Sequence, residues 1–81
     1  MIVKVRYFAG AHEIAKADAE KLRVRDGASL EELAELIIKL HPGLKRLRGS
    51  VRFSVNMEVA GESRALKDGD EVGVLPPVAG G

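Results

Sequence analysis

Apolar and polar residues alternate along four stretches of the chain, and a helical repeat lies between the second and the third. Alternation with period two predicts strands over residues 2–8, 20–25, 51–59 and 71–75. In the first and third stretches the odd-numbered positions are apolar and are expected to face the core: Val3, Val5, Tyr7, Val51, Phe53, Val55, Met57 and Val59. Lys4, Arg6 and Phe8 would then face outward, as would Leu75 in the last strand.

The helical repeat begins at a capping box. Ser29 precedes Glu32 by three residues, so each side chain can satisfy a free backbone N–H at a helix start. The apolar positions that follow form one helical stripe: Leu30, Leu33, Ala34, Ile37 and Leu40. Pro42 ends the helix, because the residue before a proline is disfavoured in the helical region. His41 is then expected in a capping position.

The predicted order is strand, strand, helix, strand, strand. A single amphipathic helix must bury its stripe against one face of a sheet. The residues between 25 and 51 are long enough for the crossover that parallel strands require. The sequence therefore predicts an α+β roll in which a mixed sheet packs on one main helix.

Composition and charge exclude several classes of function but do not identify one. The chain has 81 residues, 46% of them hydrophobic and 31% charged, which fits one small globular domain. The net charge of +1 provides no field that would draw the whole molecule to nucleic acid or to an anionic membrane. No signal peptide or membrane span is expected, so we predict a cytoplasmic protein without nucleic-acid or membrane partners. Many Lys, Arg and Glu residues beside few amides favour a thermophilic source.

Candidate catalytic groups are few. The chain has no cysteine, and its two histidines, His12 and His41, are expected in a loop and at a helix end. Ser29 is better explained as a helix cap than as a nucleophile. No metal site and no bound cofactor are expected, and the chain has no catalytic machinery of its own.

Basic side chains are predicted to gather on the exposed face of the sheet. Alternation places these residues outward: Lys4, Arg6, Lys21, Arg23, Arg25 and Arg52. Such a face either keeps the protein soluble or docks an acidic protein partner. Nucleic acid is disfavoured, because no array of stacking aromatics accompanies the charges. Phe8 shares the face of Lys4 and Arg6 and is a candidate interface anchor.

The last six residues read PPVAGG. Pro76 and Pro77 cannot donate to a sheet and favour an extended backbone, so we expect a domain over residues 1–75 and an extended tail over 76–81. The tail continues with Val78, Ala79, Gly80 and Gly81. Residues without bulk can thread a narrow channel. The tail is therefore expected to deliver the carboxylate of Gly81 into the active site of another protein.

Four stretches together resemble the MoaD family, the small subunits of molybdopterin synthase within the ubiquitin-like sulfur carriers. They are VKVRYFAGAHEI at 3–14, SLEELAELI at 29–37, VNMEV at 55–59 and LKDGDEVGVLPPVAGG at 66–81. The last stretch is the most specific. The resemblance implies a β-grasp fold, with strands and helix in the order ββαββ.

The resemblance also implies a mechanism. An E1-like, MoeB-like enzyme uses ATP to adenylate Gly81, sulfur then gives a thiocarboxylate, and a MoaE-like large subunit receives the tail and passes the sulfur to a pterin precursor. The complex with the large subunit would be a heterotetramer that contains two small subunits. By position, Phe8, Val59 and Leu75 match hydrophobic family contacts with the partner. In the family an aromatic pair often precedes Pro-Pro, where this chain has Val74 and Leu75.

Two other functions stay open. Related carriers supply sulfur for tRNA thiolation or, as ubiquitin does, join lysines of other proteins through the terminal glycine. The other alternative is a β-grasp interaction module with an inert tail.

Overall fold

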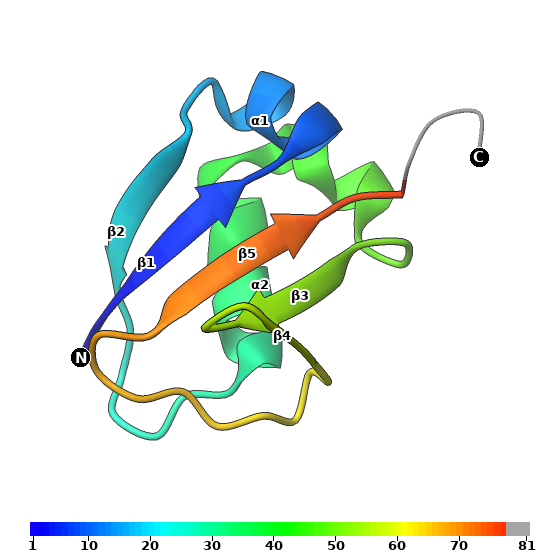
Figure 1. Ribbon diagram of the computed structural model, residues 1–81. Coiled ribbons are helices and arrows are strands. Elements are labelled where there is room, and N and C mark those ends of the chain that lie inside the picture. Colours follow the sequence, from blue (N-terminus) through cyan, green and yellow to red (C-terminus); the bar gives the residue numbers. More distant parts are fainter. Residues whose placement is uncertain (78–81) are drawn as a thin grey trace.

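The computed structural model describes residues 1–77, and Figure 1 shows how their elements are arranged. Five strands form one sheet: β1 (Ile2–Tyr7), β2 (Ala19–Arg23), β3 (Arg52–Val55), β4 (Glu58–Ala60) and β5 (Glu71–Leu75). Three helical segments complete the fold: α1 (Ala9–Ala15), α2 (Leu30–Leu40) and the 3-10 helix η1 (Pro42–Leu47). The predicted α+β roll is confirmed.

The strand order in the sheet is β2-β1-β5-β3-β4. β5 lies at the centre, parallel to β1 and antiparallel to β3. Because β1 and β5 are parallel, their C-terminal ends lie at the same end of the sheet (Figure 1). Phe8 and Pro76 directly follow these two strands. Hydrogen bonds on both sides of β5 fix the point from which the C-terminal residues depart.

The core lies between the sheet and α2. Its largest fully buried side chains are Leu30, Leu33, Val3, Val5, Val55 and Val72. Tyr7 and Phe53 are also buried, as predicted, but Leu40 is 49% exposed, so its expected place in the core stripe is wrong. Leu40 is the last residue of α2, where the helix ends beyond its contact with the core.

The start of α2 agrees with only half of the predicted capping box. The Ser29 hydroxyl accepts a hydrogen bond from the Glu32 N–H at 3.3 Å. The Glu32 carboxylate does not return the bond to Ser29 and pairs with the Arg25 guanidinium. Arg25 therefore connects the loop before α2 to the first helical turn. The alternation had predicted Arg25 on the exposed face of the sheet, and this prediction is wrong, because β2 ends at Arg23.

The third predicted strand is in fact a tight hairpin. The chain reverses at Asn56 and Met57, whose φ values of 50° and 72° are typical of a type I′ turn. Because the turn has two residues, odd-numbered positions of β4 pair with even-numbered positions of β3. Val59 therefore pairs with Ser54 rather than with a core residue. Met57 and Val59 are consequently 93% and 69% exposed, and the prediction that both face the core is wrong.

Candidate functional site

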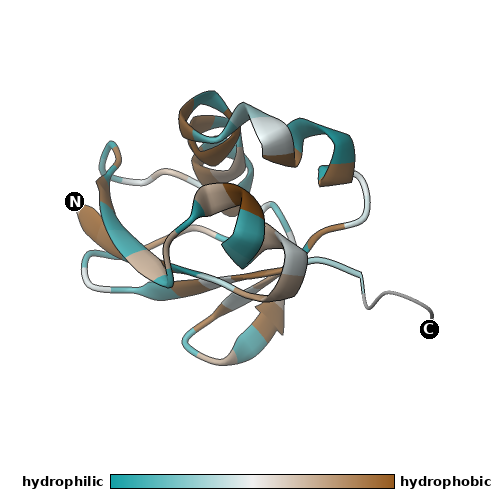
Figure 2. Cartoon of the chain, turned by 90° about the horizontal axis from the view of Figure 1, so that it is seen from above, coloured by the Kyte–Doolittle hydropathy of each residue, from teal (hydrophilic) through white to brown (hydrophobic). Residues whose placement is uncertain are grey.

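No helix within residues 1–77 packs on one of the two faces of the sheet. α2 packs against the opposite face, as the view along the sheet in Figure 2 shows. Cross-strand pairs place Arg6, Gly73, Ser54 and Val59 side by side on the free face, from β1 across to β4. We call this the outer face. It also carries Lys4, Lys21, Arg52 and Leu75.

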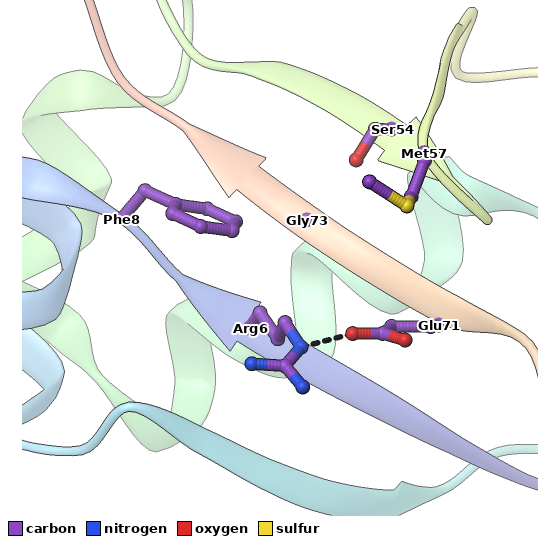
Figure 3. A pocket seen from close by; sticks show the side chains of 6 residues that line it. All are labelled: Arg6, Phe8, Ser54, Met57, Glu71 and Gly73. Carbon is purple, nitrogen blue, oxygen red and sulfur yellow. Dashed lines mark hydrogen bonds and ion pairs between the residues drawn. The ribbon is translucent and has the colours of Figure 1, made fainter.

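A hollow of about 380 Å³ lies at the middle of the outer face. Its lining residues are Arg6, Phe8, Ser54, Met57, Glu71 and Gly73 (Figure 3). Gly73 forms the floor, where a Cβ atom would lie only 2.5 Å from the Ser54 Oγ and 3.2 Å from the Phe8 ring. Glycine is therefore required for the hollow to exist with Phe8 and Ser54 in their present positions.

Two apolar side chains, Phe8 and Met57, line the hollow, and two more lie near it on the outer face. Phe8 is 44% exposed, and its N–H donates to the Val74 carbonyl oxygen at 3.3 Å, which fixes the ring next to β5. Leu75 is half-buried two residues beyond Gly73, on the same face. We call Phe8, Met57, Val59 and Leu75 the outer apolar patch. Exposed apolar clusters of this kind commonly mark protein interfaces.

The outer apolar patch brings the predicted interface residues onto one face. Phe8, Val59 and Leu75 come from three different strands or strand ends and share that face with Lys4 and Arg6. Their contact with a partner stays a prediction. Sequence reasoning missed Met57 and Ser54, because apolar alternation continues through the hairpin turn and conceals it. It also missed Gly73, whose importance depends on Ser54 and Phe8 as its neighbours in space. The Asn before Met57 was the available turn signal.

The root of the C-terminal tail lies beside the outer apolar patch. Pro76 and Pro77 follow β5 directly and line a second hollow with residues of α1 and η1: Ala9, Gly10, Glu13, Ile14, Arg46 and Leu47. β5 ends at Leu75, where the sequence placed the domain boundary. Val78, Ala79, Gly80 and Gly81 lie outside the described residues, so their extended course and the reactive role of Gly81 stay predictions.

The outer face is less uniformly basic than the sequence suggested. Arg6 pairs with Glu71 across β1 and β5, and Glu71 is also the cross-strand neighbour of Lys4. Lys4 and Lys21 stand directly opposite each other on β1 and β2. Positive charge is therefore concentrated towards the β2 edge, while the centre of the face combines a neutralised ion pair with apolar side chains.

A polar cluster joins β1, β2 and the end of α2. The Tyr7 hydroxyl donates to Glu20 Oε2 at 2.5 Å, and His41 Nε2 lies 2.5 Å from the same oxygen. Burial, with a smaller contribution from the Glu20 hydrogen bond, raises the pKa of Tyr7. For Glu20, burial alone would raise the pKa, but hydrogen bonds from Tyr7 and His41 outweigh it and lower the pKa from its ordinary 4.5. The ionised carboxylate thus stabilises the fold.

We expect Glu20→Gln to destabilise the protein by about 1–3 kcal/mol at neutral pH, since a charged acceptor of two hydrogen bonds is lost. The lowered pKa means that the folded state holds fewer protons than the unfolded state in acid. The contribution of Glu20 is therefore complete above its ordinary pKa of 4.5 and is lost as the pH falls through the lower folded value. Urea unfolding of both proteins from neutral to acid pH measures it.

The difference in unfolding free energy between the wild type and Glu20→Gln should shrink as the pH falls. Glu13→Gln is the control, because Glu13 is exposed and forms no ion pair among the described residues. A difference that stays constant into acid would show that the charge of Glu20 is not what stabilises the cluster.

Both histidines occupy structural positions in the fold. His41 caps α2, with its N–H donating to the Ile37 carbonyl oxygen at 2.8 Å, and its ring meets Glu20. His12 lies in α1 rather than in a loop, and its Nε2 is 2.6 Å from Asp18 Oδ1. Within residues 1–77, no three His, Cys, Asp or Glu side chains gather as a metal-binding group. No helix in this part of the chain is long and apolar enough to cross a membrane.

The geometry is thus an exposed apolar patch beside the root of a tail. Residues 5–81 match the ThiS family over nearly the whole sequence. The chain belongs to the ThiS family. The resemblance to the ubiquitin-like sulfur carriers and the β-grasp class of this ThiS-family protein are therefore confirmed. The fold adds a short fifth strand, β4, to the strand order expected from the sequence.

Relatives of this ThiS-family protein include named sulfur carriers. The chain is 40% identical to the molybdopterin synthase sulfur carrier subunit of Chlamydomonas reinhardtii, over the whole of both chains. It is also similar to SAMP1, a small archaeal modifier protein of Haloferax volcanii, with 25% identity, a TM-score of 0.90 and full coverage of both chains.

A second similar structure is a protein complex. It is the complex of subunits 1 and 2 of the molybdopterin-converting factor from Helicobacter pylori. The chain matches it with 32% identity and a TM-score of 0.71, again over the whole of both chains.

Proposed function

We propose that this ThiS-family protein is the sulfur carrier subunit of molybdopterin synthase and that it acts through a thiocarboxylate on Gly81. The full-length identity of 40% with a carrier of that name carries the proposal. The position of the tail root supports it, because Pro76 leaves the central strand next to the outer apolar patch. A partner that receives the tail would therefore meet the patch at the same time.

The chemistry at Gly81 requires an activating partner, since a carboxylate is a poor acyl donor. An oxygen of the Gly81 carboxylate attacks the α-phosphorus of ATP, and pyrophosphate leaves. Hydrosulfide then attacks the carbonyl carbon of the acyl adenylate and displaces AMP, with loss of one proton. In this scheme the activating enzyme is E1-like and binds the ATP, and the carrier contributes the carboxylate and the surface that is recognised.

The large subunit would supply the active site in which the sulfur leaves. The complex of the two converting-factor subunits from Helicobacter pylori supports a partner of this kind. In molybdopterin synthesis two sulfurs are transferred, so the complex with the large subunit would be a heterotetramer that contains two carriers. We propose that this sulfur transfer takes place in the cytoplasm.

Intact mass measurement tests the proposal. The protein is incubated with an E1-like enzyme, ATP and sulfide, and its mass is measured without reducing or alkylating reagents. We expect a species heavier by one sulfur-for-oxygen exchange, located at Gly81 by fragmentation. A chain that stays unmodified under these conditions, and also when isolated from its own cells, would contradict the proposal and favour an inert interaction module.

A second candidate function is protein modification or sulfur supply for tRNA. The similarity to SAMP1 favours it. Gly81 would then form an isopeptide bond with a lysine of another protein, or its sulfur would pass to a tRNA base. Digestion of cell extracts and detection of lysines that carry C-terminal glycines of this chain would support the modifier function.

A further inference from the structure

Met57 occupies a backbone position that suits glycine better. It is the second residue of the two-residue turn between β3 and β4, with φ at 72°. Type I′ turns favour Asn-Gly, and Asn56 satisfies the first position. The Asn56 side chain fixes the turn, because its Nδ2 donates to Asp70 Oδ1 at 3.0 Å and its Oδ1 accepts from the Glu71 N–H at 3.0 Å. Met57 therefore cannot relax to an easier conformation.

Packing among residues 1–77 does little to compensate for this strain. Met57 is 93% exposed, so its side chain gains almost nothing from the rest of the protein. Strained residues that are held in place by their surroundings are common at functional sites. A methionine is also well suited to an interface, because its flexible thioether adapts to the surface that it meets.

Met57 lies at one wall of the hollow above Gly73, and Phe8 forms another (Figure 3). The ion pair between Arg6 and Glu71 lies at the rim of this hollow. Because these two charges neutralise each other, a charged guest gains little net attraction at the rim. A neutral apolar side chain, by contrast, would bury its surface against Phe8 and Met57.

We propose that Met57 is a docking anchor and that the hollow above Gly73 receives one neutral apolar side chain of the large subunit. This inference rests on the proposed function. Val59 lies opposite Ser54 and Leu75 lies two residues beyond Gly73 on the same outer face, and the tail begins directly after Leu75. A protein that receives the tail thus approaches the hollow, and Met57 closes over the inserted side chain.

The variant Met57→Gly separates docking from folding. Glycine adopts a positive φ without strain, so the melting temperature should rise, by about 4 °C for a domain of this size. The same change removes the anchor, so the dissociation constant for the large subunit should increase by about tenfold or more. Calorimetric titration of the purified large subunit and thermal unfolding measure the two effects. If Met57 only stabilised the fold, Met57→Gly would lower both the melting temperature and the affinity for the large subunit.

Three further variants sharpen the test. Met57→Leu keeps an apolar side chain at the turn and should retain most of the affinity. Ser54→Ile grows from β3 over Gly73, fills the hollow and should weaken binding by a similar factor, while the β-branched side chain suits the strand. Leu40→Ala is the matched control, because Leu40 is an exposed apolar residue on α2, away from the outer face, and should leave the affinity unchanged.

The outcomes distinguish this inference from the proposed function. If the wild type binds the large subunit and Met57→Gly or Ser54→Ile binds equally well, the anchor and the hollow are not used, and the proposed function stands. If the wild type does not bind the large subunit at all, the inference and the synthase assignment both fail, whereas thiocarboxylate formation at Gly81 would still identify a sulfur carrier.

Discussion

Deletion of Gly81 is expected to abolish sulfur transfer while the melting temperature stays unchanged. Among residues 1–77, the buried side chains of the core extend no further than Val74. The deletion leaves Gly80 as the terminal residue and shortens the reach of the carboxylate by roughly 3.3–3.6 Å. A misplacement of this size at a reacting group costs on the order of a hundredfold or more in rate.

The measurement combines intact mass after activation with sulfur transfer to the pterin precursor in the reconstituted synthase. A second variant, Gly81→Leu, keeps the length and adds bulk where the tail would pass through a narrow channel, and it should fail as well. The control is Gly61→Ala, because an added Cβ at Gly61 meets no atom within 4 Å. Full activity in either tail variant would mean that the tail does not carry the sulfur.

The second large effect is expected at Phe8. In Phe8→Asp a carboxylate replaces the ring at the wall of the hollow, where docking of the large subunit would bury it without a partner. Such a change at the centre of an interface typically weakens binding by on the order of a hundredfold or more. The domain should remain folded, because Phe8 is 44% exposed and lies outside the core between the sheet and α2.

Leu40→Asp is the control for this change. Leu40 is 49% exposed and belongs to α2, which packs on the opposite face of the sheet. The two variants therefore introduce the same charge at similar exposure on different faces. Titration of the large subunit should distinguish them, with weak binding only for Phe8→Asp. Equal affinity of both variants would place the interface elsewhere on the protein.

Basic residues and apolar residues occupy different parts of the outer face, which the sequence alone does not indicate. Its basic residues lie mainly towards β2, where Lys4 and Lys21 are cross-strand neighbours. Its centre is apolar and close to neutral, because Arg6 is paired with Glu71. We therefore expect the charges to guide the approach of a partner and the outer apolar patch to supply most of the binding free energy.

The sequence by itself determined the elements that depend on local pattern. Alternation placed Val3, Val5 and Tyr7 in the core, and helical spacing placed Leu30 and Leu33 there. These predictions hold because the period of the apolar residues reports which side of a single strand or helix is buried. The order of the elements was enough to predict the α+β roll, and the resemblance carried by the tail was enough to indicate the family.

Only the tertiary structure decided what depends on pairing between strands. Because the turn at Asn56 and Met57 has two residues, Val59 lies beside Ser54 on the outer face. In the sequence, its spacing from Val55 had predicted that both residues face the core. The hollow exists because Gly73 of β5 meets Ser54 of β3 and the ring of Phe8. Register and proximity between distant segments are not recorded in the periodicity of any one segment, so the outer apolar patch could be recognised only in the assembled sheet.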